Sequence, residues 1–489
     1  MTVLGWGLAT PLMAAPDETT QMAQAAAVVR GQFDVPHELT ATGSFSYVRV
    51  PAWIQEAYFL PNCFVFQPSH SAACGVTVGT GDAPVTVRTQ FSNYPPLYFL
   101  WVGIPTLVLS GKGAIYAMRF ASGLVDTSLL ALGIYLLLRH HPRRLPIVGA
   151  LVAITPMVLF LSAVINASGL EISAAFACWC AGLCMIEQSE VPRSLSVWTA
   201  VAFAIFISSR PLSAVNATVV LVILAMMAGW SRIRTIARDA GTQVIAAVIV
   251  TATVVAGVLL LLGGPPVLLG SPMRPSLHLT GAVRLLLRGE PALLQQAVGR
   301  FGWLDTPIPG WVAVAWVVMV AGLCVFGLAT CGRCRRALPV LILAVLILPI
   351  VFEVPKINAV GPYWQGRYSL PLLVGIPLVA AAGRPRRPHS KPRFQLAPRL
   401  VSAARVLGMA ALAFLVAWSQ VATFVLALHR YTTGLGVVPG TRVSWTPPGG
   451  ILLAIAVFVS GEVLLVTSVG FQVLRPSRHG TPARAPGAH

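Results

Sequence analysis

Charged residues are scarce in this sequence. Asp, Glu, Lys and Arg make up only 10% of the 489 residues, whereas they make up about 25% of a soluble globular domain. Hydrophobic residues account for 56%, and the mean hydropathy is +0.78. Apolar runs of roughly 20 residues, the length that crosses a bilayer, recur along the chain. This composition excludes a soluble globular protein and predicts an all-α polytopic membrane protein.

Acidic residues are the scarcer charge. The sequence has 15 Asp and Glu against 34 Lys and Arg, which gives a formal net charge of +19. Such a charge invites a nucleic-acid interpretation, but the basic residues cluster in short loops between apolar runs. Cytoplasmic loops of membrane proteins gather positive residues in this way. The pattern therefore predicts the lipid bilayer as a partner and no nucleic acid.

The sequence also lacks several motifs that mark soluble catalysts. It has no Walker loop, zincin helix or nucleophile elbow, and its 8 cysteines form no metal framework. Cys331 and Cys334 have redox or zinc spacing without a partner pair, so we interpret them as part of a basic cytoplasmic turn. Cys63 and Cys74 lie in a polar loop. If that loop faces an oxidising compartment, we expect a disulfide, the alternative being two free thiols.

Alternating apolar and polar stretches predict about twelve spans in a single transmembrane domain, residues 1–473. The first span is short, residues 97–109 are expected at the interface, and the count of basic residues places both termini in the cytoplasm of a plasma-membrane protein. Residues 17–96 and 263–309 form two large extracytoplasmic loops with interfacial helices, residues 383–401 a basic cytoplasmic loop, and 474–489 a disordered tail. The expected spans are 3–15, 114–138, 145–165, 170–186, 195–207, 212–230, 244–262, 311–329, 338–351, 368–382, 406–428 and 451–473.

Adjacent carboxylates, Asp17 and Glu18, follow the first apolar segment. Partial burial would raise the pKa of one of two neighbouring carboxyls towards that of a useful general base. The pair could instead bind a divalent cation through oxygen ligands. A third interpretation, which residue types alone favour, is an ordinary helix N-cap after Pro16.

Several charges interrupt apolar stretches, where they are costly. Arg119 and Asp126 are spaced to share a helix face, which favours a structural ion pair. Arg210, near the outer surface, is a candidate for binding a lipid phosphate, although its side chain could also reach the interface as an ordinary basic residue. Arg367 is a second phosphate candidate, with Lys356 just before it. We find no role in the sequence for Glu462.

Aromatic and acidic residues of the outer loops suggest a substrate groove. Tyr94 and Tyr98 flank a rigid Pro-Pro turn that places aromatics in the interfacial belt, a position compatible with lining a groove for a lipid-linked substrate. Trp303 could stack on a sugar ring, although tryptophan is common at membrane surfaces. Glu171, at an outer turn, and Asp305 complete the candidate groove.

The sequence resembles an actinobacterial family of multi-pass membrane proteins of unknown function. That family is distantly similar to the C-type glycosyltransferases, which take sugars from polyprenyl-phosphate donors at the outer membrane face. The resemblance implies that an acidic residue of the first outer loop, here Asp17 or Glu18, acts as a base or metal ligand. Two departures are the short first helix and Thr19, Thr20 and Gln21, where many members have a histidine. The motifs that carry the resemblance are Ala15-Pro16-Asp17-Glu18, Tyr94-Pro95-Pro96-Leu97-Tyr98, Asn166-Ala167-Ser168-Gly169-Leu170-Glu171, Ser209-Arg210-Pro211, Phe301-Gly302-Trp303-Leu304-Asp305 and Gln365-Gly366-Arg367-Tyr368.

The resemblance implies glycosyl transfer with inversion from a polyprenyl-phosphate sugar to a cell-envelope glycan or glycolipid. Asp17 or Glu18 would be the base, and Arg210, Arg367 and Lys356 would bind the donor phosphate. A divalent cation is a possible cofactor. The alternatives are a transporter or flippase of envelope lipids and a non-catalytic envelope-assembly protein.

Overall fold

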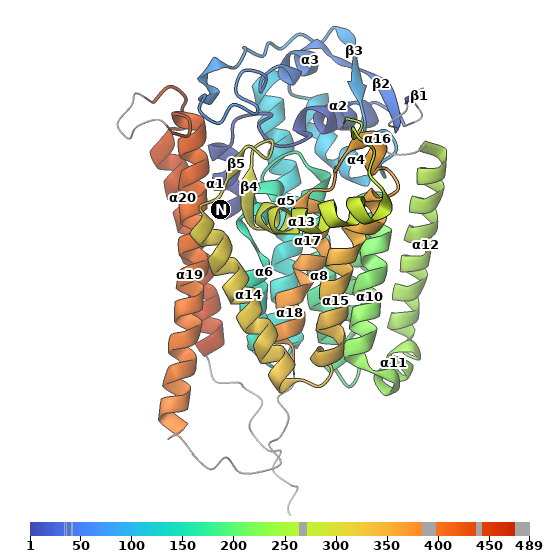
Figure 1. The fold of residues 1–489 in the computed structure, drawn as a ribbon, viewed down its shortest axis with the longest axis vertical. Helices are drawn as coiled ribbons and strands as arrows, with labels where there is room; N and C mark the ends of the chain where they lie inside the picture. Colours follow the sequence, from blue (N-terminus) through green and yellow to red (C-terminus); the bar gives the residue numbers. More distant parts are fainter. Residues whose placement is uncertain are drawn as a thin grey trace, which may run out of the picture.

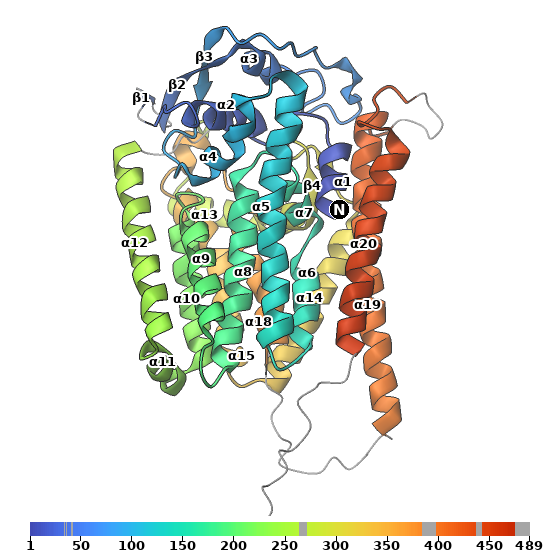
Figure 2. The ribbon, with the colours of Figure 1, turned by 180° about the vertical axis from the view of Figure 1, so that it is seen from behind.

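The computed structural model describes residues 1–33, 35, 37–40, 43–263, 271–383, 398–436 and 443–474. Long helices run side by side along the long axis of the molecule, and one end carries a layer of short helices and strands (Figures 1 and 2). Helix α11 and the link between α14 and α15 lie at the opposite end. The expected disordered tail and most of the basic loop 383–401 fall outside the described residues.

Seven helices of the described chain are long and apolar enough to cross a membrane, and nine if each of two bent pairs counts as one span. The predicted count of twelve is not confirmed, because the other three expected spans are short helices: α1 (Thr2–Ala9), α9 (Arg193–Ile207) and the pair α17 (Gly366–Leu373) and α18 (Gly375–Ala381). The seven are α5 (Gly111–His140), α8 (Ala167–Glu187), α12 (Ala240–Gly263), α14 (Gly310–Thr330), α15 (Cys334–Glu353), α19 (Pro398–Thr432) and α20 (Ile451–Leu474).

Two bent pairs replace expected continuous spans. Helices α6 (Leu145–Ala153) and α7 (Pro156–Ser162) meet at 65°. Pro156 cannot donate a backbone hydrogen bond and disfavours helical geometry at the preceding residue, so the helix stops there. Helices α10 (Ser213–Ala228) and α11 (Trp230–Ala237) meet at 113° around Gly229, whose φ of 76° favours glycine.

The first polar segment contains a β-sheet, which corrects the all-α prediction. Strands β1 (His37–Thr40), β2 (Gly43–Pro51) and β3 (Pro84–Thr89) pair antiparallel in the order β1-β2-β3. Val48 and Val50 of β2 are buried, whereas the alternate residues Tyr47 and Arg49 are exposed. This alternation is typical of a sheet with one covered face. Helices α2 (Glu18–Val28) and α3 (Ala52–Tyr58) accompany the sheet at this end (Figure 1).

Shorter elements complete the same end of the molecule. Helices α4 (Leu97–Gly103) and η2 (Ile104–Leu107) are together too short to span a membrane, and α4 packs closely on α2. The second large loop holds α13 (Leu279–Gly299), which lies across the long helices in Figure 1. The remaining elements here are η1 (Ala72–Cys74), β4 (Arg300–Phe301), β5 (Thr306–Pro307) and α16 (Ile357–Val360).

Helix α1 anchors the segment that leads to Asp17. Its Trp6 is fully buried, with ring centroids 4.7 Å from Phe301 and 5.4 Å from Phe424. The helix ends at Ala9, and Thr10 is extended because Pro11 follows it. The expected first span therefore ends early. The N-terminus lies partway along the bundle (Figure 1), so its cytoplasmic placement stays a prediction.

Candidate functional site

Asp17 precedes α2 in a strained conformation. Its φ of 62° is left-handed, a region that non-glycine residues enter at a cost of about 1–3 kcal/mol and that recurs at functional sites. Although Asp17 occupies the N-cap position, its side chain makes no capping hydrogen bond. The carboxylate instead contacts Arg367 Nη2, and Gln90 Nε2 donates to its Oδ1 at 3.3 Å. The side chain remains 21% exposed, so this carboxylate can be reached from outside.

Glu18 is fully buried and pairs with a different guanidinium, that of Arg119. Arg119 binds it with two hydrogen bonds, Nε to Oε1 at 2.7 Å and Nη2 to Oε2 at 2.8 Å. The backbone N–H groups of Ala15 and Ile165 donate to the same carboxylate. Glu18 is thus surrounded by hydrogen-bond donors and connects α5 to the segments before α2 and α8. Asp17 is therefore the accessible acid of the pair.

The ion-pair partner of Arg119 is Glu18, and not Asp126 as expected. Besides Glu18, its guanidinium donates to the carbonyl oxygens of Thr10 at 2.6 Å and Pro11 at 2.7 Å. The guanidinium therefore fixes the turn before Asp17, while the Asp126 carboxyl lies beside Gly169 of α8. Spacing along one helix did not reveal a partner 101 positions away.

The two adjacent carboxylates bind different guanidinium groups, Asp17 that of Arg367 and Glu18 that of Arg119. A divalent cation shared by the pair stays a prediction. Within the described ranges, no group of three or more His, Cys, Asp or Glu side chains is placed to hold a metal ion. We derive no step through a metal.

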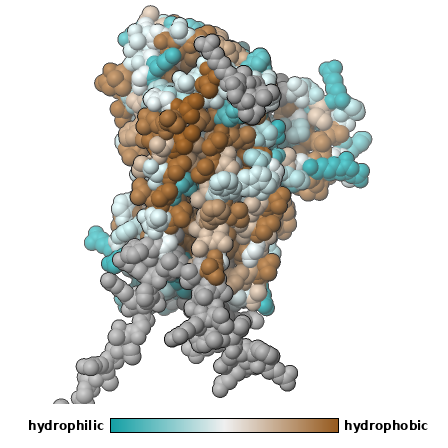
Figure 3. All heavy atoms as spheres, turned by 90° about the vertical axis from the view of Figure 1, so that its left-hand side faces the viewer, coloured by the Kyte–Doolittle hydropathy of each residue, from teal (hydrophilic) through white to brown (hydrophobic). Residues whose placement is uncertain are grey.

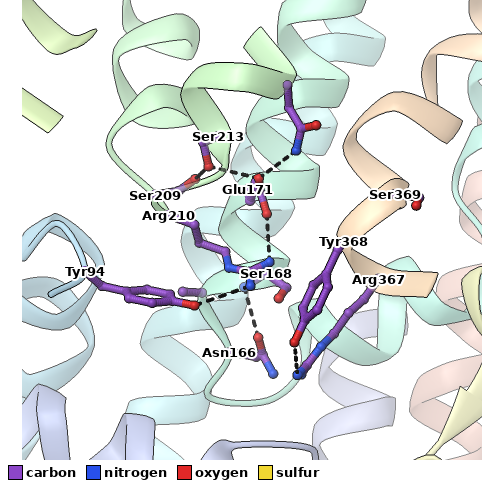
Figure 4. A network of polar contacts seen from close by, with 12 residues as sticks. Tyr94, Asn166, Ser168, Glu171, Ser209, Arg210, Ser213, Arg367, Tyr368 and Ser369 are labelled. Atoms are coloured by element: carbon purple, nitrogen blue, oxygen red, sulfur yellow. Dashed lines mark hydrogen bonds and ion pairs between the residues drawn. The ribbon is translucent and has the colours of Figure 1, made fainter. Parts of the chain in front are cut away.

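Arg210 lies in the link between α9 and α10, and Glu171 of α8 orients its guanidinium (Figure 4). Its Nη1 donates to Glu171 Oε2 at 3.0 Å. The other oxygen of this buried carboxylate accepts from Ser213 at 2.9 Å and Asn216 at 3.1 Å. Arg210 is therefore held largely inside the protein, and Glu171 supports it without being exposed itself.

Tyr368 lies between the two arginines. The guanidinium carbon of Arg210 is 4.7 Å from the Tyr368 ring centroid, and that of Arg367 is 5.2 Å from it. Arg367 Nη2 donates to the Tyr368 hydroxyl at 3.3 Å, and Arg210 Nη2 to the Tyr94 hydroxyl at 3.4 Å. Asp17, Tyr94, Arg210, Arg367 and Tyr368, from distant parts of the sequence, thus form one polar cluster.

The first turn of α8 couples the two halves of this cluster. Asn166 caps the helix by accepting from Ser168 N–H at 2.9 Å, and its Nδ2 donates to the carbonyl of Pro16 at 2.9 Å. One turn later the same helix presents Glu171 to Arg210. The motif from Asn166 to Glu171 therefore positions both Asp17 and Arg210.

Other expected site residues lie outside the cluster. Tyr98 is buried between helices, with its hydroxyl 3.1 Å from Ser122 Oγ, and so does not line a groove. Lys356 is exposed next to α16. Trp303 is half-buried and donates to the Met13 carbonyl at 3.2 Å, which places it near the turn that precedes Asp17.

Asp305 connects the two large polar loops, residues 17–96 and 263–309. Its Oδ2 accepts from Arg430 Nη2 at 3.4 Å and from the backbone of Phe66 at 3.1 Å. Arg430 also donates to carbonyl oxygens of the segment enclosed by Cys63 and Cys74, whose Cα atoms are 5.9 Å apart in a disulfide. Asp305 therefore joins the two loops and does not face the cluster.

Gln90 and Tyr368 contact the cluster, and Arg430 binds Asp305 outside it; none of the three was in the expected site. Tyr368 follows Arg367 directly, in a Gln-Gly-Arg-Tyr string at the start of an apolar run, and an aromatic beside a membrane arginine is a usable signal. Gln90 and Arg430 reach their partners only through tertiary contacts, and no local pattern marks them.

Loss of the disulfide should loosen the outer layer without dissolving the bundle. We expect Cys63→Ser to destabilise that layer by about 2–3 kcal/mol, the usual effect of opening a short loop. Hydrogen exchange of residues 59–75, with and without reductant, measures it. Cys324→Ser, a cysteine outside the disulfide, is the matched control, and unchanged exchange in Cys63→Ser would contradict the expectation.

Comparison with known proteins gives a family and a distant structural similarity. No curated protein matches this sequence. Two crystal structures of ArnT from Cupriavidus metallidurans are similar. The structure bound to undecaprenyl phosphate has a TM-score of 0.44 and 12% identity, and the match covers 97% of this chain and 76% of that chain. The structure in the apo state has a TM-score of 0.43 and 13% identity, and the match covers 96% of this chain and 75% of that chain. A model of predicted membrane proteins matches residues 1–376, more than half of the chain. The chain therefore belongs to the family of predicted membrane proteins DUF2142.

Proposed function

We propose that this membrane protein transfers a sugar from a polyprenyl-phosphate donor to a cell-envelope glycan or glycolipid on the outer face of the plasma membrane. The observation that supports the proposal most is the pairing of Asp17 with Arg367. A partly exposed carboxylate lies against one guanidinium, and a second guanidinium, that of Arg210, shares the Tyr368 ring. This combination supplies a proton acceptor beside an anion site.

The two arginines suit a lipid phosphate. A guanidinium keeps its charge when buried and presents several donors to phosphate oxygens. Arg367 Nε is buried without a hydrogen-bond partner in the described part of the chain, so this guanidinium keeps one donor that the protein does not use. Arg210 is held in place by Glu171, which lowers the cost of ordering it when a phosphate binds.

The reaction would proceed by a single displacement with inversion. The acceptor hydroxyl oxygen attacks the anomeric carbon, and the bond between that carbon and the phosphate oxygen breaks. The hydroxyl proton passes to Asp17, and the electron pair leaves on polyprenyl phosphate, whose charge Arg210 and Arg367 stabilise. A phosphate that binds Arg367 competes with Asp17 for this guanidinium, which frees the carboxylate to take the proton.

A lipid transporter is the second candidate, and the bent pair α6–α7 favours it. Broken helices within the membrane are common in transporters. Here, however, the break is closed by polar contacts: Thr155 Oγ1 donates to the Ala297 carbonyl at 2.9 Å and accepts from Val158 N–H at 3.3 Å. Thr155 and Val158 at this break are thus bonded within the protein and are not left open to hold a substrate. For this reason we prefer sugar transfer to lipid transport.

A reconstituted assay separates these functions. Proteoliposomes of the wild type receive a panel of polyprenyl-phosphate sugars together with extracted envelope glycans and glycolipids. We expect one sugar to move to an acceptor with release of polyprenyl phosphate. Movement of intact donor between leaflets without cleavage would support the transporter instead, and neither movement nor cleavage by a protein that binds the donor would support the non-catalytic alternative.

Replacing Arg210 should weaken polyprenyl phosphate binding. Loss of one charge-assisted hydrogen bond costs about 1.5–3 kcal/mol, or roughly a 10- to 100-fold rise in Kd. Because Arg210→Gln alone leaves Glu171 buried and unpaired, the double variant with Glu171→Gln is the cleaner measurement. Arg336→Gln, an exposed arginine at the opposite end, is the control. An unchanged Kd in the double variant would contradict a phosphate role for Arg210.

A further inference from the structure

A groove on the far side of the molecule from α12 contains an isolated acid. It has a volume of about 450 Å³ and lies between α6, α19 and α20. Figure 3, which looks onto the side that carries α19 and α20, shows broad apolar areas there. The lining includes Leu151, Phe414, Trp418, Val459 and Glu462.

Glu462 is the feature that the apolar surroundings do not explain. It lies near the middle of α20, is only 3% exposed, and its Oε1 is buried without a hydrogen-bond partner among the described residues. Thr467, the other polar residue of the lining, already donates to the Val463 carbonyl at 2.6 Å. A buried carboxyl without a partner is costly in a membrane, so a bound group that hydrogen-bonds to it would offset that cost.

The length and lining of the groove suit a single hydrocarbon chain. The lining of α19 runs from Met409 to Val421, which is roughly 18 Å at the helical rise. Almost all of the side chains along that length are apolar. The groove is therefore long and apolar enough to hold one lipid chain.

The chemistry of Glu462 selects the polar group on that chain. In an apolar groove a carboxyl is most stable when protonated, and it then offers one donor and one acceptor. A hydroxyl group offers the same two functions and matches both. An ammonium group would bring a full charge into a lining that is apolar apart from Glu462, Thr467 and the Trp418 indole, and burying a charge costs more than burying a hydroxyl. We propose that the groove between α6, α19 and α20 binds a single-chain neutral lipid whose hydroxyl group hydrogen-bonds to Glu462.

This site is separate from the proposed transfer site and involves none of its residues. The groove is lined by α6, α19 and α20, whereas Asp17 precedes α2, Arg210 lies between α9 and α10, and Arg367 belongs to α17. A second lipid on the protein would therefore bind whether or not the protein transfers a sugar.

Photolabelling of the full chain in nanodiscs tests the proposal. The probes are a long-chain primary alcohol with a diazirine, its methyl ether and the matching alkylammonium. We expect the alcohol to label peptides of α19 and α20 in the wild type roughly 3- to 10-fold more than the ether, the factor that one hydrogen bond supplies. Equal labelling by alcohol and ether, or stronger labelling by the ammonium, would overturn the proposal.

Variants at the carboxyl give an independent comparison. Glu462→Leu should reduce alcohol labelling to the level of the ether, whereas Glu462→Gln, which keeps a donor and an acceptor, should retain it. Ser460→Leu is the matched control, because Ser460 is exposed on the same helix and does not line the groove. If Glu462→Leu labels as strongly as the wild type, the hydroxyl assignment is wrong. The wild-type comparison of alcohol with ether stands even if a variant does not fold.

Discussion

Asp17→Asn is expected to slow sugar transfer by about 100- to 10,000-fold, the usual contribution of a general base. The amide has the size of the carboxylate and keeps an oxygen that can accept from Gln90 and Arg367. Because Asp17 remains 21% exposed and supports no backbone cap, its replacement should leave the fold intact. Transfer kinetics in proteoliposomes, with the melting temperature measured in parallel, check both parts.

Binding should separate this effect from a loss of substrate affinity. Asn lacks the charge that competes with a phosphate for Arg367, so the Kd for polyprenyl phosphate should stay the same or fall in Asp17→Asn. Asp82→Asn, an exposed acid of the same loop, is the control and should transfer normally. Normal transfer by Asp17→Asn would remove Asp17 from the mechanism, and lost binding would give it a structural role.

Glu18→Leu should have the opposite consequence, a large loss of stability. It leaves the Arg119 guanidinium buried without its carboxylate, and breaking a buried ion pair in this way costs about 3–5 kcal/mol. Three segments would loosen together, since Arg119 also binds the carbonyls before Asp17 and Glu18 accepts from Ile165. Thermal unfolding in detergent measures the effect.

A double variant tests whether the unpaired buried charge causes that loss of stability. Glu18→Gln combined with Arg119→Gln removes both charges and should restore part of the stability lost in either single variant. Arg143→Gln, which removes a partly exposed ion pair with Glu187 at the other end, should cost much less. A Glu18→Leu protein as stable as the wild type would contradict the structural role.

The sequence could not predict which of the two acids at the start of α2, Asp17 or Glu18, is buried. Neighbouring residues at a helix start point in different directions, so the string Asp-Glu alone cannot say which one is enclosed. The partners decide it, and they lie at Arg119 and Arg367, far along the chain. Residue types favoured a helix cap, and the structure shows no capping bond from Asp17.

The arginines were easier to predict. A charge at the edge of an apolar run is costly enough to require a function or a partner, and this singled out Arg210 and Arg367. Their shared contact with Tyr368 required the fold, because Arg210 precedes α10 and Tyr368 belongs to α17. Apolar runs likewise predicted most long helices, but not the breaks at Pro156 and Gly229 or the stop before Pro11.

The sheet was missed for a different reason. Residues 44–47 and 48–50 each alternate over a short stretch, with a change of phase between Tyr47 and Val48, and they lie inside a long polar loop whose composition suggested only interfacial helices. Their pairing with residues 84–89 depends on contacts across the intervening α3 and disulfide loop. Only the local alternation was visible in the sequence.

The most direct test of the proposed site is photolabelling with a diazirine-bearing polyprenyl phosphate, followed by localisation of the label. We expect labelled peptides at the start of α10 and of α17, with competition by unlabelled polyprenyl phosphate and much weaker competition by polyprenol. Labelling should fall when Arg210 and Arg367 are both replaced by Gln. Label that lies elsewhere, or that polyprenol displaces as well as polyprenyl phosphate does, would contradict a lipid-phosphate site at Asp17, Arg210 and Arg367.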